Sequence, residues 1–196
     1  MIFKRTVLLS LVLLAGYELW GQQSHQDFYL QSQHNINTGM YVLGSWAILN
    51  MATGVYGMST QQGSSKYFYQ MNLFWNTVNL GIAGFALFHN LSNDGGLLSN
   101  RQILEEHFRS EKLFLINAGL DVLYIAGGAF MVHKSKNSTK RPDLLKGYGN
   151  SIIMQGGFLL VFDAVLYFIQ HAHSNRFLEN LHVGFTLESI QLTLNF

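Results

Sequence analysis

The sequence predicts an all-α protein: a four-helix bundle that spans a membrane, with both ends of the mature chain on the outer face. Three observations lead to this prediction. Only 12% of the 196 residues are charged and 48% are apolar, whereas soluble proteins carry about 25% charged residues. Four intervals nearly free of charge each hold roughly 20 mostly apolar residues, the length that crosses a hydrocarbon core as a helix. Basic residues gather in one loop.

The first 21 residues have the pattern of a secretory signal peptide. Lys4 and Arg5 form a positive start, residues 7–16 are apolar, and Gly21 is a small residue at a suitable cleavage point. We therefore assign 1–21 as a signal peptide and 22–38 as an external segment. An uncleaved first helix is the alternative, and it would leave the remaining topology unchanged.

The spacing of charged residues places the four spans. Asp, Glu, Lys and Arg are absent between Asp27 and Lys66 and again between Lys66 and Asp94. The third and fourth intervals, 113–133 and 147–175, contain one charged residue each. The predicted helices are 39–58, 67–90, 111–133 and 150–172, and together they form a bundle over 39–172.

Orientation follows from the third loop. That loop contains one acidic residue, Asp143, and five basic residues: Lys134, Lys136, Lys140, Arg141 and Lys146. Short loops rich in Lys and Arg stay in the cytoplasm, so this loop and 59–66 are predicted inside. The N-terminus, the second loop and a tail at 173–196 are then outside, as a cleaved signal peptide also requires. These features predict a multi-pass membrane protein.

Two outer segments have patterns of their own. Ser99 followed by Gln102 is typical of a capping box that opens a helix. We expect that helix to run through Phe108 along the outer membrane surface before it turns inward. In the tail, Thr186 and Thr193 belong to a strand-like stretch, which could pair with the sheet edge of a partner or remain a free interfacial end.

Polar residues inside the spans form the main candidate site, because they are costly in hydrocarbon and therefore mark packing or function. On three of the helices they recur every three or four residues, which places them on one face. Counting helix rise from the outer ends puts Asn50, Asn79, Asp121 and Asp163 at one depth. The predicted intramembrane polar network consists of Asn50, Asn72, Asn76, Asn79, Asn117, Asp121, Asp163 and Tyr167.

Two interpretations of this network stay open. It is either a set of interhelical hydrogen bonds that fixes helix register, at about 0.6 to 2 kcal/mol per bond, or a proton or cation site built on Asp121 and Asp163. No Lys, Arg or His within the spans is available to neutralise the two carboxyl groups. Small residues such as Gly54 and Gly128 recur along the same spans and favour close helix packing under either interpretation.

Histidines are the candidate metal ligands. His89 and His171 end the second and fourth spans at the same interface, so a metal or haem between them is conceivable. However, His171 and His173 are two residues apart and point to opposite sides of a helix. There is also no HExxH motif. We therefore predict no metal site and no cofactor.

Other classes of function find no support in the sequence. The chain has no cysteine, so thiolate metal sites and a cysteine nucleophile are excluded. A net charge of +1 gives no reason to expect nucleic acid as a partner. GxSxG, P-loop and GxGxxG motifs are absent. Enzymatic activity is not indicated, although a membrane enzyme or redox protein that uses the outer histidines stays as a third alternative.

Three stretches together resemble a known family: YFYQMNLFWNTVNLGIAGF (67–85), NAGLDVLYIAGG (117–128) and LLKGYGNSIIMQGGFLLVFD (144–163). The sequence resembles small, uncharacterised four-helix membrane proteins of Gram-negative bacteria that carry a signal peptide. The resemblance implies the four-span fold and the importance of Asn72, Asn76, Asn79, Asp121 and Asp163. It carries over no catalytic or binding role. A short similarity between 52–56 and 126–130 also suggests two duplicated helical hairpins.

The predicted function is that of a non-enzymatic inner-membrane protein that acts through contacts with other envelope proteins, with the lipid bilayer around it. It could also self-associate into a homo-oligomer. The alternative is a small protein that handles protons or cations through Asp121 and Asp163.

Overall fold

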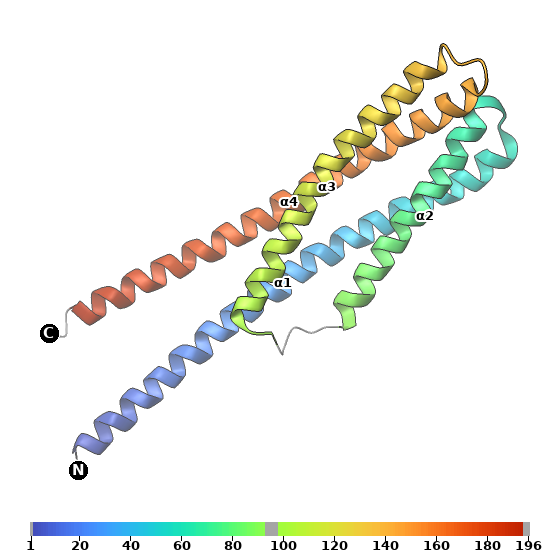
Figure 1. The fold of residues 1–196 in the computed structure, drawn as a ribbon. Coiled ribbons are helices and arrows are strands. Elements are labelled where there is room, and N and C mark those ends of the chain that lie inside the picture. The colour runs from blue at the N-terminus through green and yellow to red at the C-terminus, as the bar shows by residue number, and fades with distance from the viewer. Residues whose placement is uncertain (1, 93–97, 194–196) are drawn as a thin grey trace.

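The protein is an antiparallel arrangement of four long helices. The computed structural model describes residues 2–92 and 98–193, with side chains for 25–92 and 98–179. The helices are α1 (Ile2–Thr60), α2 (Gly63–Ser92), α3 (Asn100–Ser135) and α4 (Pro142–Thr193). Figure 1 shows the turns α1–α2 and α3–α4 at one end, with the start of α1 and the end of α4 at the other. Over the described residues there is no strand, so the all-α, four-helix prediction is confirmed.

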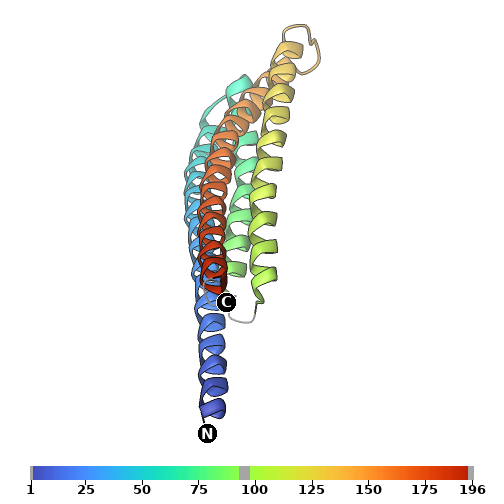
Figure 2. The same ribbon diagram turned by 90° about the vertical axis from the view of Figure 1, so that its left-hand side faces the viewer.

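The helices pack as two hairpins that diverge. α1 packs along α2, α3 packs along α4, and α2 joins the hairpins by packing on α4. α1 also meets α3 and α4 over a shorter length (Figure 1). Among the described residues, no Cα atom of α2 lies within 8 Å of one in α3. Figure 2 shows the helices side by side along one long axis, so the separation of α2 from α3 forms a lengthwise gap.

Glycines bring the helices together near the turns. A Cβ atom at Gly128 of α3 would lie 2.7 Å from the carbonyl oxygen of Gly149 in α4. A Cβ atom at Gly147 would lie 2.7 Å from the backbone nitrogen of Phe68 in α2. Only glycine permits such backbone contact, as at other small-residue helix crossings. Gly63 has φ of 57°, a left-handed conformation that glycine adopts without strain. It begins α2 after the two residues that follow the end of α1.

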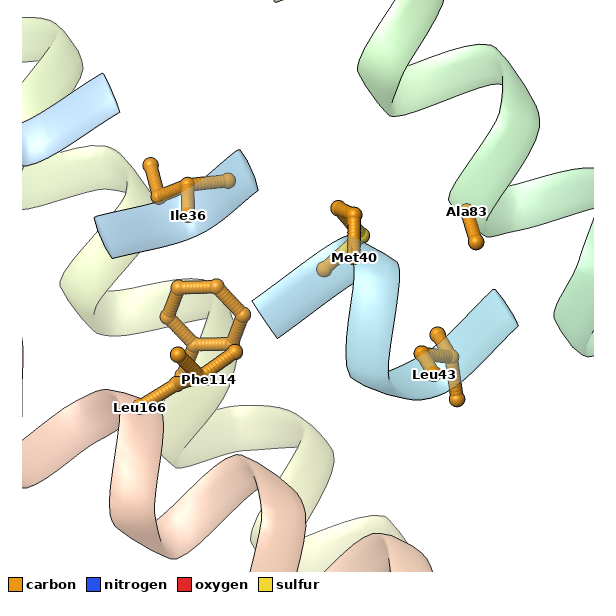
Figure 3. Close-up of a cluster of buried hydrophobic side chains, with 6 residues drawn as sticks. All are labelled: Ile36, Met40, Leu43, Ala83, Phe114 and Leu166. Carbon is orange, nitrogen blue, oxygen red and sulfur yellow. The ribbon is translucent and has the colours of Figure 1, made fainter. Parts of the chain in front are cut away.

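The apolar core lies midway along the bundle, where both hairpins contribute. Ile36, Met40 and Leu43 of α1 meet Ala83 of α2, and Phe114 of α3 and Leu166 of α4 complete the cluster (Figure 3). The α1 residues recur at four and three positions, one face of a helix. This cluster fixes α1 across the interface between the hairpins.

Outside this cluster the usual distribution of polarity is reversed. Buried side chains include Asn72, Asn76, Gln155 and Gln170, all 1% exposed or less. Large apolar side chains point outward along all four helices, among them Tyr56, Phe85, Leu123 and Phe168. In water such an apolar surface would be unfavourable, because monomeric soluble proteins rarely expose large contiguous apolar patches.

Two of the helices are long and apolar enough to cross a membrane by length and composition: α3, and α4 over Pro142–Glu179. The search covered the described residues. α1 and α2 do not meet this criterion, and one reason is visible in α2, whose Asn72, Asn76 and Asn79 lower its mean hydropathy although they are buried.

All four helices extend beyond their predicted bounds, and three expectations are affected. α1 is helical through 22–38. The sequence predicted an external segment there, followed by a helix at 39–58. α3 is continuous from Asn100, so the capping box of Ser99 and Gln102 is confirmed, whereas the surface helix that turns inward after Phe108 is wrong. The strand-like tail is also wrong, because α4 stays helical to Thr193. Extending an existing helix avoids the cost of nucleation, and this favours continuation over a new strand.

Candidate functional site

Polar side chains join three helices at the level nearer the turns. Asn72 of α2 donates from Nδ2 to the backbone oxygen and to Oδ1 of Asn50 in α1, at 3.1 Å each. Asn76, one turn along, donates to the backbone oxygen of Asn72 at 2.8 Å. Gln155 of α4 donates to Oδ1 of Asn72 and accepts from Nε1 of Trp46 at 3.0 Å. These bonds fix the register of α1, α2 and α4.

Gln155 does not belong to the predicted network, which contains only Asn, Asp and Tyr residues. A buried glutamine in the middle of an apolar interval has the same desolvation cost as a buried asparagine. Gln155 is buried between the helices in the same way as Asn72. Asn79 lies seven residues from Asn72, or roughly 10 Å along the helix. The predicted single depth for Asn50 and Asn79 is therefore wrong: Asn50 pairs with Asn72, since α1 and α2 extend beyond the predicted span ends.

The second polar group lies in the gap between α2 and α3. A cavity of about 750 Å³ occupies this gap, with α1 and α4 contributing to its walls. Asp121 (α3) and Asp163 (α4) lie close enough for their carboxyl groups to interact, and Asn117 lies close enough to interact with Asp163. All three residues line the cavity, as does Asn79 from α2. Two carboxyl groups can form a hydrogen bond only if one of them holds a proton.

Apolar and aromatic residues make up most of the cavity wall. Met40, Val78, Ile82, Leu113 and Phe162 line it between its polar positions. Trp75 and Tyr124 also line it and meet edge to face across the gap, with ring centroids 4.9 Å apart. The cavity is thus an apolar groove with a few convergent polar groups, the usual composition of a ligand site.

A third polar group joins α1 to α3 and α4 at the end of the bundle opposite the turns. His107 of α3 is hydrogen-bonded through Nδ1 to Oγ of Ser32 at 2.8 Å and through Nε2 to the backbone oxygen of Gln170 at 3.2 Å. Gln170 donates to Oγ of Ser32 at 3.0 Å. We call Ser32, His107 and Gln170 the outer clasp.

Proton placement in the outer clasp follows from its partners. A backbone oxygen can only accept, so Nε2 of His107 carries the proton and Nδ1 accepts from Ser32. Burial lowers the pKa of His107 to about 4, and the charge of nearby His173 lowers it too, while the bond to Gln170 and the charge of Glu111 act in the opposite direction. His107 lies outside the predicted 111–133 span and is neutral at pH 7.

The candidate metal ligands are engaged in other interactions. His171 forms a 2.6 Å contact with Glu111 of α3, and Ser174 donates to the same carboxylate at 3.2 Å. On α2, Nδ1 of His89 lies 3.5 Å from Oδ1 of the adjacent Asn90. Within residues 25–92 and 98–179, no three His, Asp or Glu side chains converge in a manner that could hold a metal ion.

The predicted network is therefore divided in space. Asn50, Asn72 and Asn76 belong to the cluster with Gln155, whereas Asn79, Asn117, Asp121 and Asp163 line the groove. Tyr167 joins neither group. Its ring stacks on His171 with centroids 5.5 Å apart, and it packs against the apolar core.

The fold and these groups define an all-α protein of four long helices with a polar interior and a groove between two of them. The chain belongs to the family of unknown function DUF6992, whose model matches residues 42–164. That range includes every residue of the predicted polar network except Tyr167. No curated protein and no solved structure matches the chain.

Proposed function

We propose that the protein is a non-enzymatic, four-span inner-membrane protein of a Gram-negative bacterium that acts by binding through its α2–α3 groove. The observation that supports this most is the reversed distribution of polarity. Asparagine, glutamine and aspartate side chains are buried between the helices, while large apolar side chains cover the outside of all four helices. Hydrocarbon stabilises that arrangement, and water does not.

Both ends of the bundle fit this placement. The basic residues Lys134, Lys136, Lys140 and Arg141 are all exposed beside the α3–α4 turn, which is the end that the positive-inside rule assigns to the cytoplasm. At the opposite end, α1, α3 and α4 carry the outer clasp. The groove would then open toward the outer leaflet, because Glu106, Arg109 and Asn90 line it on that side.

Single cysteines test the topology, since the chain has none of its own. Asn137→Cys and Arg101→Cys replace exposed residues at opposite ends of α3. In intact cells an impermeant maleimide should label Arg101→Cys at once and Asn137→Cys only after the membrane is opened. Simultaneous labelling of both variants in intact cells would rule out the four-span placement.

A second candidate function is the handling of protons or cations. It is favoured by the approach of Asp121 and Asp163 at the wall of a cavity, since a shared proton between carboxyl groups can be exchanged. Proteoliposomes of the protein should then show a flux driven by a pH gradient, which Asp121→Asn and Asp163→Asn abolish without unfolding the bundle. Absence of flux from the unaltered protein would leave the carboxyl pair with a binding or packing role.

A further inference from the structure

Among the described residues, three of the six buried side-chain polar atoms without a hydrogen-bond partner belong to residues that line the α2–α3 groove. Nδ2 of Asn79, Oδ2 of Asp121 and Oε1 of Gln33 form no hydrogen bond, and all three residues line the same cavity. The side chains of Asn79 and Asp121 are each only 3% exposed. A buried polar atom without a partner is unfavourable by about 1–3 kcal/mol, so three of them around one space point to a polar group that occupies it.

The size of the groove decides what kind of molecule fits. The cavity of about 750 Å³ falls within the roughly 300–1,000 Å³ of small-molecule sites, which are mostly apolar with a few polar groups. One lipid-sized chain therefore fits the space.

The unpaired atoms specify the polar group of the ligand. The amide nitrogen of Asn79 can only donate, while Oδ2 of Asp121 accepts when the shared proton is held elsewhere in the pair. A carbonyl group would satisfy Asn79 and leave Asp121 unpaired, and an ammonium group would satisfy Asp121 and leave Asn79 unpaired. A hydroxyl group both accepts and donates, so it can bond with both residues at once.

We propose that the α2–α3 groove binds a membrane-soluble amphiphile with a hydroxyl head, which accepts from Asn79 and donates to Asp121 while its apolar chain lies against Val78, Leu113 and Phe162. The ligand enters from the outer leaflet between α2 and α3, where no backbone contact closes the gap among the described residues. This inference rests on the membrane placement proposed above and deepens it by assigning the class of ligand.

A photoreactive monoacylglycerol that carries a diazirine in its chain is the probe, with the protein held in phosphatidylcholine nanodiscs. After irradiation, mass spectrometry of the peptides should place most crosslinks within 74–90 and 106–124. Unlabelled monooleoylglycerol should compete for them. Methyl oleate, which has the same chain but no hydroxyl donor, should compete about tenfold less well, as expected for the loss of one buried hydrogen bond.

Two tryptophan variants provide a matched pair. Val78 and Val122 are each 51% exposed, but only Val78 lines the groove. Val78→Trp should fill the groove and lower specific crosslinking about tenfold, while Val122→Trp should leave it unchanged. Asn79→Leu, which removes the donor at similar size, should lower crosslinking to the same extent even if the groove stays open.

Several results would overturn the proposal. Equal crosslinking of the lipid-facing residues Val161 and Phe168 would mean ordinary contact with bulk lipid, and equal competition by methyl oleate would remove the role of the hydroxyl. Unchanged crosslinking in Val78→Trp would place the probe elsewhere. If folded protein gave no crosslinks, the groove would be filled by water. If the crosslinks lay on a co-purified polypeptide, the groove would be occupied by a protein. The cysteine-labelling experiment reports failure of the membrane placement separately.

Discussion

Replacing Gly128 by alanine should separate α3 from α4, whereas the same change at the adjacent Gly127 should not. The added Cβ atom at position 128 would lie 2.7 Å from the carbonyl oxygen of Gly149, 2.9 Å from Cγ1 of Ile153 and 3.1 Å from its backbone nitrogen. Two of these three atoms belong to the backbone, so the clash cannot be relieved by a rotamer change. At Gly127 a Cβ atom would meet no atom within 4 Å.

The magnitudes follow from two opposing effects. Alanine favours a helix over glycine by about 0.5–1 kcal/mol, and this gain is the main effect at Gly127. Overpacking in a close contact costs typically 1–3 kcal/mol, which outweighs the gain at Gly128. The two variants should therefore differ in free energy of unfolding by about 2 kcal/mol, with Gly127→Ala at least as stable as the unaltered protein.

Reversible unfolding in mixed micelles with increasing dodecyl sulfate, followed by circular dichroism, measures this difference. Gly149→Ala provides a second test from the opposite helix, since its Cβ atom would lie 2.6 Å from the carbonyl oxygen of Gly128. If Gly128→Ala were as stable as Gly127→Ala, the close crossing of α3 and α4 would not exist.

The remaining predictions concern the outer clasp, the polar cluster and a helix end. Because burial lowers the pKa of His107 from 6.5 to about 4, the unfolded chain binds more protons between these values. Stability is therefore full above pH 6.5 and falls by up to about 3 kcal/mol as the pH drops toward 4. His107→Gln should remove this pH dependence. His34→Gln, at an exposed site, is the control and should keep it. Amide hydrogen exchange of residues 25–40 at pH 7 and pH 4.5 measures the stability of each variant. Gln155→Leu should lower the free energy of unfolding by about 1–3 kcal/mol, because it leaves Nε1 of Trp46 without its acceptor and removes one donor to Asn72; unchanged stability would contradict the cluster. Ser99→Ala should cost about 1 kcal/mol through loss of the N-cap, with fraying limited to the first turns of α3 in amide exchange.

Much of the fold could be predicted from the sequence because it depends on local patterns. Charge-free intervals locate the helices, and the Ser99–Gln102 pair locates the start of α3. The outer clasp could not be predicted in this way. Ser32 lies in a polar segment rich in Gln, Asn and His, which favours an external location. Ser32, His107 and Gln170 are nevertheless hydrogen-bonded to one another across three helices.

The candidate site was predictable in its residue types and less so in its arrangement. Asn72 and Asp121 are indeed buried, as a polar residue in an apolar interval suggests. Their division into a cluster and a groove depends on how the hairpins diverge, which leaves no local pattern. The glycines show the same limit: Gly54 and Gly128 are packed tightly, while Gly81 and Gly84 face open space, although all four lie in similar sequence.

The outer clasp and the glycine contacts hold the two hairpins at opposite ends by unlike forces. Gly147 is fixed against α2 by backbone contact, which changes little with solvent conditions. Gln170 lies 23 residues away, roughly 34 Å along α4, where hydrogen bonds to a titratable histidine hold the structure. The two ends of the bundle therefore differ in their response to pH: the glycine contacts do not depend on it, whereas the hydrogen bonds at Gln170 require a neutral His107.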